Sequence, residues 1–415
     1  MRKIPNLRHL RAFREVVREK SISLAAKKVY LSQPAITQAI AKLEEMLDAP
    51  LFERRNDGMY PTEPGTLFQI RVDRALTHIE TGTREALRLG GKKGGRGFAN
   101  FDQLLTAAQL RALAAIAGAG NFSLAARAIG VSQPALHRAA RDLERLAGIA
   151  LFTKTGQGIV LTRAADVLTQ HAKLAFAELE QGFEEIGGWR GHDTAVITVG
   201  SMPLPRSFLL PSAINSLMRG SPDVRVRVVD GPYDDLLSGL RQGDLDMLVG
   251  AMREPVPIED VMQEPLFQDP LAVVARSGHP LARKRHISIA DLIEYPWVLP
   301  RVGAPTRELF ERAFRDVEGL NLSGVIEASS LILIRELLIG SNRLTFISAH
   351  QVRHEQSLGL LAVLNVDMPR VSRPIGLTVR RDWRPTATQA RFLHLLRRAG
   401  RSLDYGRANP FLFEN

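Results

Sequence analysis

The most constraining feature of the sequence is a repeat with a period of 100 residues. The segment 23–26 (Ser-Leu-Ala-Ala) recurs at 123–126, and the segment 32–35 (Ser-Gln-Pro-Ala) recurs at 132–135. An ungapped comparison of 21–55 with 121–155 gives 13 identities in 35 positions, where ordinary amino-acid usage would give about two. This period is too long for a solenoid and fits a small domain followed by a connecting helix. The first 190 residues therefore contain one module twice.

The spacing inside the module predicts a helix-turn-helix. Ser32 is a good N-cap, and Pro34 falls in the first helical turn, where its missing N–H costs nothing. Apolar residues then recur at steps of four, three and four, which buries one face of the helix. Gln33, Thr37 and Gln38 are left facing outward. A short helix, a tight turn and a second helix with a small polar outer face suit the major groove of DNA.

A two-stranded wing is expected beyond this helix. The segment 51–55 (Leu-Phe-Glu-Arg-Arg) and the residues up to Thr62 read as a hairpin with Gly58 at its tip. Its arginines would contact the phosphate backbone. The DNA-binding residues predicted for the first copy are Ser32, Gln33, Pro34, Thr37, Gln38, Arg54 and Arg55.

These motifs, together with Leu43-Glu44 and Thr62-Glu63-Pro64-Gly65, resemble the winged helix-turn-helix of LysR-type transcriptional regulators. The resemblance extends along nearly the whole chain, except that family members usually carry one such module. The second module could be a redundant relic, an extra DNA contact or a dimerisation element.

The second copy differs where DNA contacts are expected. Its outward face is more basic and its wing is poorer in cations, and the DNA-binding residues predicted for it are Gln133, His137, Arg138, Arg141 and Lys154. The first copy departs from the family at Asp48, where the second copy keeps Gly148. We expect both copies to fold and the first to read the DNA sequence.

A helical stretch follows each copy. The resemblance implies that such a helix links to the ligand domain and pairs subunits; packing onto its own module is the alternative. A Gly- and Lys-rich segment between the copies reads as a flexible basic tether. The predicted domains are module 1 (1–65), a linker helix (66–89), the tether (90–101), module 2 (102–162), a second linker helix (163–188), an effector domain (193–403) and a tail (404–415).

From Ala195 onward, apolar runs typical of strands alternate with helical patterns, which indicates an α/β domain with a largely parallel sheet. The family resemblance implies two subdomains of the periplasmic-binding-protein type, with a double hinge near 269–275 and 372–380. The fold class is therefore multidomain, with two helical winged modules and one α/β effector domain.

Small molecules bind such domains outside the carboxyl ends of strands and at helix N-termini. Hydroxyls and free N–H groups there favour a carboxylate or sugar-like ligand. Resemblance further points to the branch of the family that controls aromatic-acid or sugar catabolism. The predicted effector-binding residues are Ser201, Met202, Pro232, Tyr233, Gly303, Thr306, Ser329 and Ser330.

The residue composition and spacing argue against several other classes of function. Without cysteine there is no thiol nucleophile or cysteine-ligated metal. His350 and His354 are spaced for a shared metal, but no third ligand lies nearby. We therefore expect no cofactor, no metal and no catalysis. No apolar run is long enough to span a bilayer and no signal peptide is visible, which predicts a cytoplasmic protein that does not contact membranes.

The positive charge is concentrated at the N-terminus. Residues 1–100 hold 19 Lys and Arg against 11 Asp and Glu, a balance of +8 out of a total of +11. A basic first quarter on a nearly balanced remainder suggests binding to a polyanion, although a solvated basic surface would look the same. The hypothesis is a homodimeric or homotetrameric regulator that binds promoter DNA and a small-molecule effector. The alternative is a solute-binding or interaction protein whose modules serve assembly.

Overall fold

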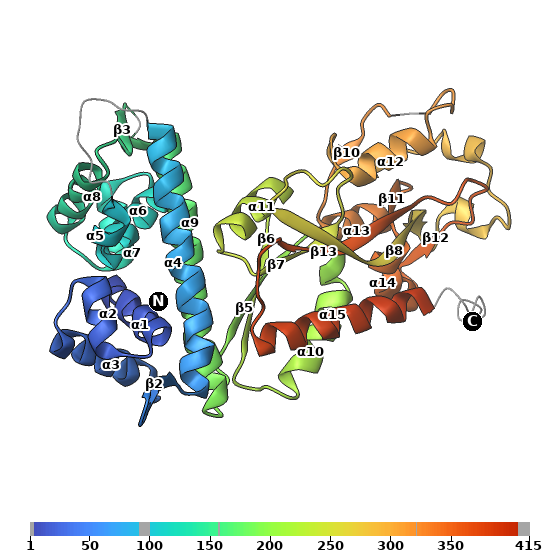
Figure 1. Cartoon of the computed structure of the whole chain (residues 1–415). Coiled ribbons are helices and arrows are strands. Elements are labelled where there is room, and N and C mark those ends of the chain that lie inside the picture. The colour runs from blue at the N-terminus through green and yellow to red at the C-terminus, as the bar shows by residue number, and fades with distance from the viewer. Residues whose placement is uncertain (1–3, 91–99, 157, 321, 406–415) are drawn as a thin grey trace. The chain divides into compact units, whose positions relative to one another are not determined.

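The two copies of the repeat fold into the same elements, offset by 100 residues. The computed structural model describes residues 4–90, 100–156, 158–320 and 322–405, and the chain divides into an N-terminal unit, mainly residues 1–195, and a C-terminal unit (Figure 1). The first copy contains α1 (Leu7–Glu19), α2 (Ile22–Val29), α3 (Gln33–Leu47), β1 (Phe52–Arg55) and β2 (Gly58–Pro61). The second contains α6 (Ala107–Ala119), α7 (Phe122–Ile129), α8 (Gln133–Ala147), β3 (Phe152–Thr155) and β4 (Gly158–Leu161), preceded by the short α5 (Phe101–Leu104).

Local signals start the recognition helices where the sequence predicts them. The Ser32 hydroxyl accepts a hydrogen bond from the Ala35 N–H, and the Ser132 hydroxyl accepts one from the Ala135 N–H. Each hydroxyl satisfies one of the N–H groups that lack a partner inside the helix. The predicted helix-turn-helix and its wing are thus confirmed in both copies. The predicted tether lies almost wholly within residues 91–99, outside the described residues.

The copies differ in how their helices end. Lys20, Tyr30 and Asp48 cap α1, α2 and α3 with positive φ values of 51°, 52° and 50°. The second copy places glycine at each equivalent position, at 120, 130 and 148. Side chains in this left-handed region are strained by about 1–2 kcal/mol, whereas glycine is not. The first copy therefore carries backbone strain that the second lacks.

Replacing Tyr30 with glycine should stabilise the first module by about 0.5–1 kcal/mol, because relief of the strain outweighs the added freedom of the unfolded chain. Tyr30 is 90% exposed, so little packing is lost. The matched change Gly130→Ala should destabilise the second module by about 1 kcal/mol, since an added Cβ meets no atom within 4 Å and only the backbone cost remains. Hydrogen exchange of the α2–α3 and α7–α8 amides measures both changes. Shifts of the same sign in the two variants would contradict the strain argument.

The two long helices, α4 (Glu63–Gly90) and α9 (Arg163–Trp189), pack against each other along their length (Figure 1). They run antiparallel, because Arg71 meets Gly182 while His171 meets Gly82. One hydrophobic core unites both copies through this pair. Within the chain, each long helix thus pairs with the long helix of the other copy. Pairing of these helices between subunits, expected from the resemblance, stays a prediction, and within the chain they pair with each other.

The C-terminal unit is built on one mixed sheet in the order β10-β9-β11-β8-β13-β7-β5-β6, with β12 paired to β8. The long antiparallel pair β8–β13 joins two halves of the sheet, each with its own apolar clusters. The strands are β5 (Val196–Ser201), β6 (Arg225–Asp230), β7 (Met247–Ala251), β8 (Val261–Arg276), β9 (Trp297–Leu299), β10 (Ile326–Glu327), β11 (Leu344–Ser348), β12 (Leu361–Val363) and β13 (Ser372–Arg380).

Helices of this unit cover the sheet halves, and α11, α12 and α13 begin at residues that line the space between the halves. The helices are α10 (Leu209–Met218), α11 (Tyr233–Gln242), α12 (Pro305–Ala313), α13 (Leu331–Ile339), α14 (Arg353–Ser357) and α15 (Ala387–Tyr405), with the short 3-10 turns η1 (Leu204–Arg206), η2 (Pro280–Arg283), η3 (Ile289–Leu292) and η4 (Ala349–Val352). The predicted α/β pattern is confirmed. The sheet is mixed and not largely parallel, because β8 and β13 run antiparallel to their neighbours. Most of the predicted tail, residues 406–415, lies outside the described residues.

Candidate DNA-binding and effector-binding sites

The outer face of α3 is polar and exposed. Gln33, Thr37 and Gln38 are all exposed, and the Thr37 hydroxyl donates to the Gln33 carbonyl oxygen at 3.1 Å. Pro34 is exposed beside them. The hydroxyl of Ser32 accepts the capping hydrogen bond at 3.4 Å. The helix thus presents two amide side chains that suit adenine edges, which offer one donor and one acceptor.

The wing of the first copy holds one of its two arginines in place. Arg55 Nε donates to Glu53 Oε1 at 2.8 Å, and its guanidinium lies 4.8 Å from the ring centroid of Tyr60. The Tyr60 hydroxyl donates to Asp57 at 2.7 Å, which lowers the pKa of that carboxyl. Arg54 is exposed on the strand before the turn. Arg54 is therefore the better placed of the pair to meet a phosphate.

The second copy uses its corresponding residues differently. Gln133 Oε1 accepts a hydrogen bond from the Ser123 hydroxyl at 2.9 Å, and the His137 ring stacks on Phe122 with centroids 3.8 Å apart. Arg138 and Arg141 are exposed. Lys154 lies in β3, but its side chain is outside the described part of the chain. The outer face of α8 is therefore a pair of arginines beside two side chains that are already engaged.

Sequence reasoning missed exposed cations at the ends of the first helices of the motif. Lys27 and Lys28 lie in the last turn of α2, and Arg127 lies in the last turn of α7. Their position one turn before the recognition helix was the available signal, because a helix-turn-helix places this region near the DNA backbone.

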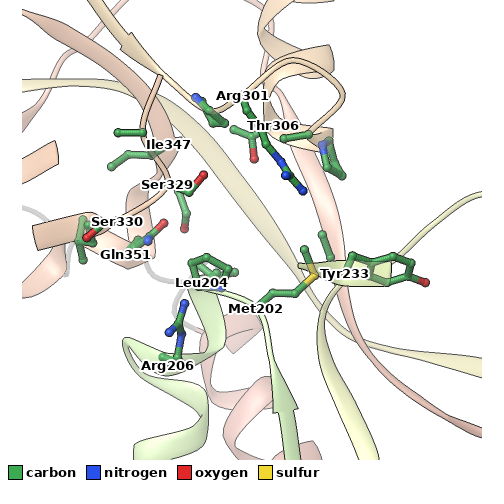
Figure 2. A pocket seen from close by; sticks show the side chains of 18 of the residues that line it. Met202, Leu204, Arg206, Tyr233, Arg301, Thr306, Ser329, Ser330, Ile347 and Gln351 are labelled. Atoms are coloured by element: carbon green, nitrogen blue, oxygen red, sulfur yellow. The ribbon is translucent and has the colours of Figure 1, made fainter. Parts of the chain in front are cut away.

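A cleft of about 830 Å³ opens between the two halves of the C-terminal unit. Figure 2 shows Ser329, Ser330 and Gln351 on one side of this space and Met202, Leu204 and Arg206 on another. Seven of the eight predicted effector residues line it: Met202, Pro232, Tyr233, Gly303, Thr306, Ser329 and Ser330. The sequence therefore located the cleft by the ends of its strands and the starts of its helices.

Ser201 is a correction, since it does not line the cleft. It is fully buried at the end of β5, and its hydroxyl donates to the Met202 carbonyl oxygen at 2.9 Å. Strand alternation turns its side chain to the interior while the next residue reaches the cleft.

Positive charge dominates the lining of the cleft. Arg206, Arg253, Arg301 and Arg373 line it together with a single carboxylate, that of Asp230. The sequence analysis missed these arginines and Gln351. Arg301 follows strand β9 directly, a position that could have suggested it, but Arg373 reaches the cleft from a crossing strand that carries no such signal.

Three of the four arginines, Arg206, Arg253 and Arg373, have partners in the cleft wall. Arg206 lies 3.4 Å from Asp230, and the Arg253 guanidinium lies 4.6 Å from the ring centroid of Tyr233. Burial raises the pKa of the Tyr233 hydroxyl, so this ring is a neutral wall at physiological pH.

Arg373 pairs with the buried Asp269 at 3.2 Å and donates to the Thr306 hydroxyl. Arg301 is exposed at the cleft, and its guanidinium forms no ion pair with any of the residues that the structure describes. Arg301 is thus the cation of the lining best placed to pair with a ligand.

Two helices, α12 and α13, begin at the same cleft. Neither Ala304, which precedes α12, nor Ser330, which precedes α13, makes a side-chain capping hydrogen bond. The first N–H groups of a helix carry partial positive charge and bind anions readily when no side chain caps them. Together with the arginines, they make the cleft suitable for a negatively charged small molecule.

No group of three or more potential metal-ligating side chains lies together among the described residues. None of the described helices is long and apolar enough to cross a bilayer.

Comparison with known proteins identifies family domains in both the N-terminal and the C-terminal part of the chain. The model of the bacterial regulatory helix-turn-helix protein, lysR family, matches residues 7–66 and again 107–166, and the LysR substrate binding domain matches 190–401. The HTH-type transcriptional regulator GalR of Pseudomonas putida is 34% identical over 383 residues, covering 91% of this chain and 93% of the relative.

Another relative aligns over a smaller part of this chain. The HTH-type transcriptional regulator PcaQ of Agrobacterium fabrum is 30% identical over 309 residues, covering 98% of its own length but 74% of this chain. The solved structure of full-length CbnR complexed with its target DNA shares the fold, with a TM-score of 0.51, 20% identity, and coverage of 71% of this chain and all of that one. The chain therefore belongs to the LysR family of bacterial helix-turn-helix transcriptional regulators, and it is a DNA-binding protein that controls transcription in response to a small molecule bound by its C-terminal domain.

Proposed function

We propose that the effector of this regulator is a small organic acid whose carboxylate binds at Arg301 and the N-terminus of α13. The observation that carries the proposal is the charge of the cleft, where the exposed Arg301 and two uncapped helix N-termini lie beside arginines already held by Asp230, Asp269 and Tyr233. A neutral sugar would give Arg301 no negative charge to pair with. Apolar side chains on the opposite wall, including Met202 and Leu204, suit a hydrocarbon or ring body.

Ligand binding would act through the two crossing strands. Met202 and Tyr233 come from one half of the unit, whereas Thr306 and Ser330 come from the other. A ligand that touches both halves binds a closed cleft more tightly than an open one and shifts the population accordingly. The strands β8 and β13 are the connections about which the halves would rotate.

On the DNA side, we propose that Gln33 and Gln38 contact base edges while Ser32, Thr37 and Arg54 contact the backbone. The protein would act at promoters in the bacterial cytoplasm as a homodimer or homotetramer. The C-terminal domain would supply the contacts between chains, because the long helices already pair within one chain.

Binding of benzoate and hexanoate, compared with benzamide and hexanamide, tests the carboxylate. By isothermal titration calorimetry the acids should bind more tightly than their neutral amides, since only the acids complement the arginines. Arg301→Gln should weaken acid binding about 10-fold or more, in line with the 1.5–3 kcal/mol of a charged hydrogen bond. Arg315→Gln, an exposed arginine outside the cleft, is the matched control. Equal binding of acids and amides, or binding of glucose alone, would refute an acid effector and leave the DNA-binding role intact.

A further inference from the structure

The pairing of α4 with α9 obeys an internal two-fold relation. Arg71 packs against Gly182, where an added Cβ would lie 3.2 Å from the Arg71 Cβ. His171, the equivalent of Arg71 in the second copy, packs against Gly82, the equivalent of Gly182, with a corresponding distance of 2.5 Å. Each long side chain of one helix thus fits the glycine of the other. The two modules are related as the two halves of a dimer would be.

The contact between α4 and α9 around Arg71 is strongly charged. Arg71 is fully buried, and its guanidinium donates to Glu178 at 2.8 Å, to Gln181 at 2.7 Å and to Glu185 at 2.6 Å. Arg74 donates to the other oxygen of Glu178 at 2.7 Å. Burial opposes the charged form of Arg71, but the two glutamates outweigh it and raise the pKa of the guanidinium. These hydrogen bonds form only when α4, which supplies the arginines, packs against α9, which supplies the acceptors.

The equivalent contact around His171 carries little charge. His171 Nε2 lies 3.8 Å from Glu85, and its Nδ1 lies 3.4 Å from Nδ1 of His78. Burial lowers the pKa of His171, which favours the neutral ring. The copies have therefore diverged in a complementary way, with the arginines on one helix and the buried glutamate on the other.

Pairing of like helices in the same register would break the charged cluster. Two α4 helices would set Arg71 and Arg74 against His78 in place of Glu178, and Arg71 would keep only the equivalent of Glu185, which is Glu85. Two α9 helices would set Glu178 against His171 and Leu174, with no arginine. A buried charge without its partner costs several kcal/mol. The differences between the copies thus favour the unlike pair and disfavour both like pairs.

Further contacts tie the modules together near this pair. Arg11 of α1 donates to the carbonyl oxygen of Gln103 at 3.0 Å, and the rings of Phe68 and Phe183 meet edge to face at 6.2 Å. Both modules also contribute to one core. Figure 1 shows the two modules side by side along the same pair of long helices.

The recognition faces of the two modules differ in chemistry. The face of α3 offers the amides of Gln33 and Gln38, which match adenine. The face of α8 offers Arg138 and Arg141, whose forked guanidinium groups match the O6 and N7 acceptors of guanine. In α8 the equivalent of Gln33 is already bonded to Ser123.

We infer that one chain of this protein reads a single DNA site made of two unlike half-sites in inverted orientation, one recognised through adenine contacts by α3 and the other through guanine contacts by α8. This inference rests on the proposed DNA-reading function. On this inference, the second module contributes to sequence specificity and is not a redundant relic. Two identical modules would require two identical half-sites, whereas this chain would bind two different ones.

Selection of bound duplexes from random-sequence DNA by the full-length protein tests the inference. The wild type should enrich a motif with two different halves. In one variant the outer residues of α3 become those of α8 (Thr37→His, Gln38→Arg, Ala41→Arg and Lys42→Asp), and it should enrich an inverted repeat of the guanine half. The reciprocal variant of α8 should enrich an inverted repeat of the adenine half. Each protein should disfavour the others' motifs by about 10-fold for each mismatched base pair.

Enrichment of a symmetric repeat by the wild type, or a motif that does not change in the α8 variant, would overturn the inference. The two variants are independent, so misfolding of one, seen by circular dichroism, leaves the other as the test. Failure of the wild type to enrich any sequence would instead reject the proposed function itself. The two failures are therefore distinguishable.

A mixture of the two variants tests whether one chain forms the pair. If α4 and α9 pair within a chain, co-expressed variants should enrich only the two symmetric motifs. If the helices paired across chains, the mixture would restore the asymmetric motif, and the single-chain part of the inference would be wrong.

Discussion

Replacing Arg71 with methionine is expected to lower the free energy of unfolding of the N-terminal unit by about 3–5 kcal/mol. The guanidinium is fully buried between Glu178 and Glu185, and methionine fills a similar volume without a charge. The loss therefore comes from Glu185, which is left without its cation in a largely buried site, and from Glu178, which keeps only Arg74. Hydrogen exchange of the α4 and α9 amides measures the change where it occurs.

Arg74→Met is the matched control for this prediction. Arg74 pairs with the same glutamate, but its side chain is 27% exposed, so water can replace the lost contact. We expect a loss of about 1 kcal/mol from it. Adding Glu185→Leu to Arg71→Met should recover part of the stability, because an apolar replacement removes the carboxylate that Arg71 no longer neutralises. Equal losses from Arg71→Met and Arg74→Met would contradict a buried charge cluster.

Replacing Gly65 with alanine is expected to destabilise the first module by about 2–3 kcal/mol. A Cβ on Gly65 would lie 2.0 Å from the carbonyl oxygen of Leu51, which belongs to the backbone and cannot rotate away. The same oxygen accepts a hydrogen bond from the Thr62 N–H at 3.0 Å. The wing and the start of α4 would have to separate to admit the methyl group, and this would also disturb the wing that carries Arg54.

The second copy supplies the comparison for this prediction within the same chain. It has Ala165 at the equivalent position, fully buried, and keeps the equivalent hydrogen bond from Thr162 to Leu151 at 3.0 Å. Ala165→Gly should therefore cost only about 1 kcal/mol, from lost burial and greater backbone freedom. Hydrogen exchange of β1 and the first turn of α4 measures the effect of Gly65→Ala. A variant as stable as the wild type would contradict the prediction, because it would show that the wing and α4 of the first copy can move as far apart as their equivalents in the second copy.

The sequence predicted those parts of the molecule whose signals are local. The helix-turn-helix follows from a cap, a proline and apolar spacing inside the segment 32–47, and the α/β pattern follows from alternating apolar runs. The repeat strengthened the first prediction because the same signals occur twice. The mouth of the cleft was located in the same way, from strand ends and helix starts.

The parts that sequence reasoning missed depend on contacts between distant segments. Arg71 meets Glu178 across 107 positions, and nothing in either helix alone reveals the register that joins them. Arg206, Arg301 and Arg373 come from three separate segments, so their shared charge emerges only in the folded unit. The helix α15 is a different kind of omission, because its buried residues Phe392, Leu396 and Leu403 follow a helical spacing that the sequence does display.

This chain is expected to discriminate between DNA sequences through its helix-turn-helix modules. Fluorescence anisotropy should be measured for the full-length protein with DNA from upstream of its own gene and with a scrambled duplex, over a range of salt concentrations. Affinity for both duplexes should fall as salt rises, while the preference for the upstream DNA persists. Gln33→Ala should reduce that preference by about 10-fold, and Gln133→Ala, whose amide is bonded to Ser123, should reduce it less. Equal affinity of the wild type for the two duplexes at every salt concentration would contradict the claim and favour modules that serve assembly.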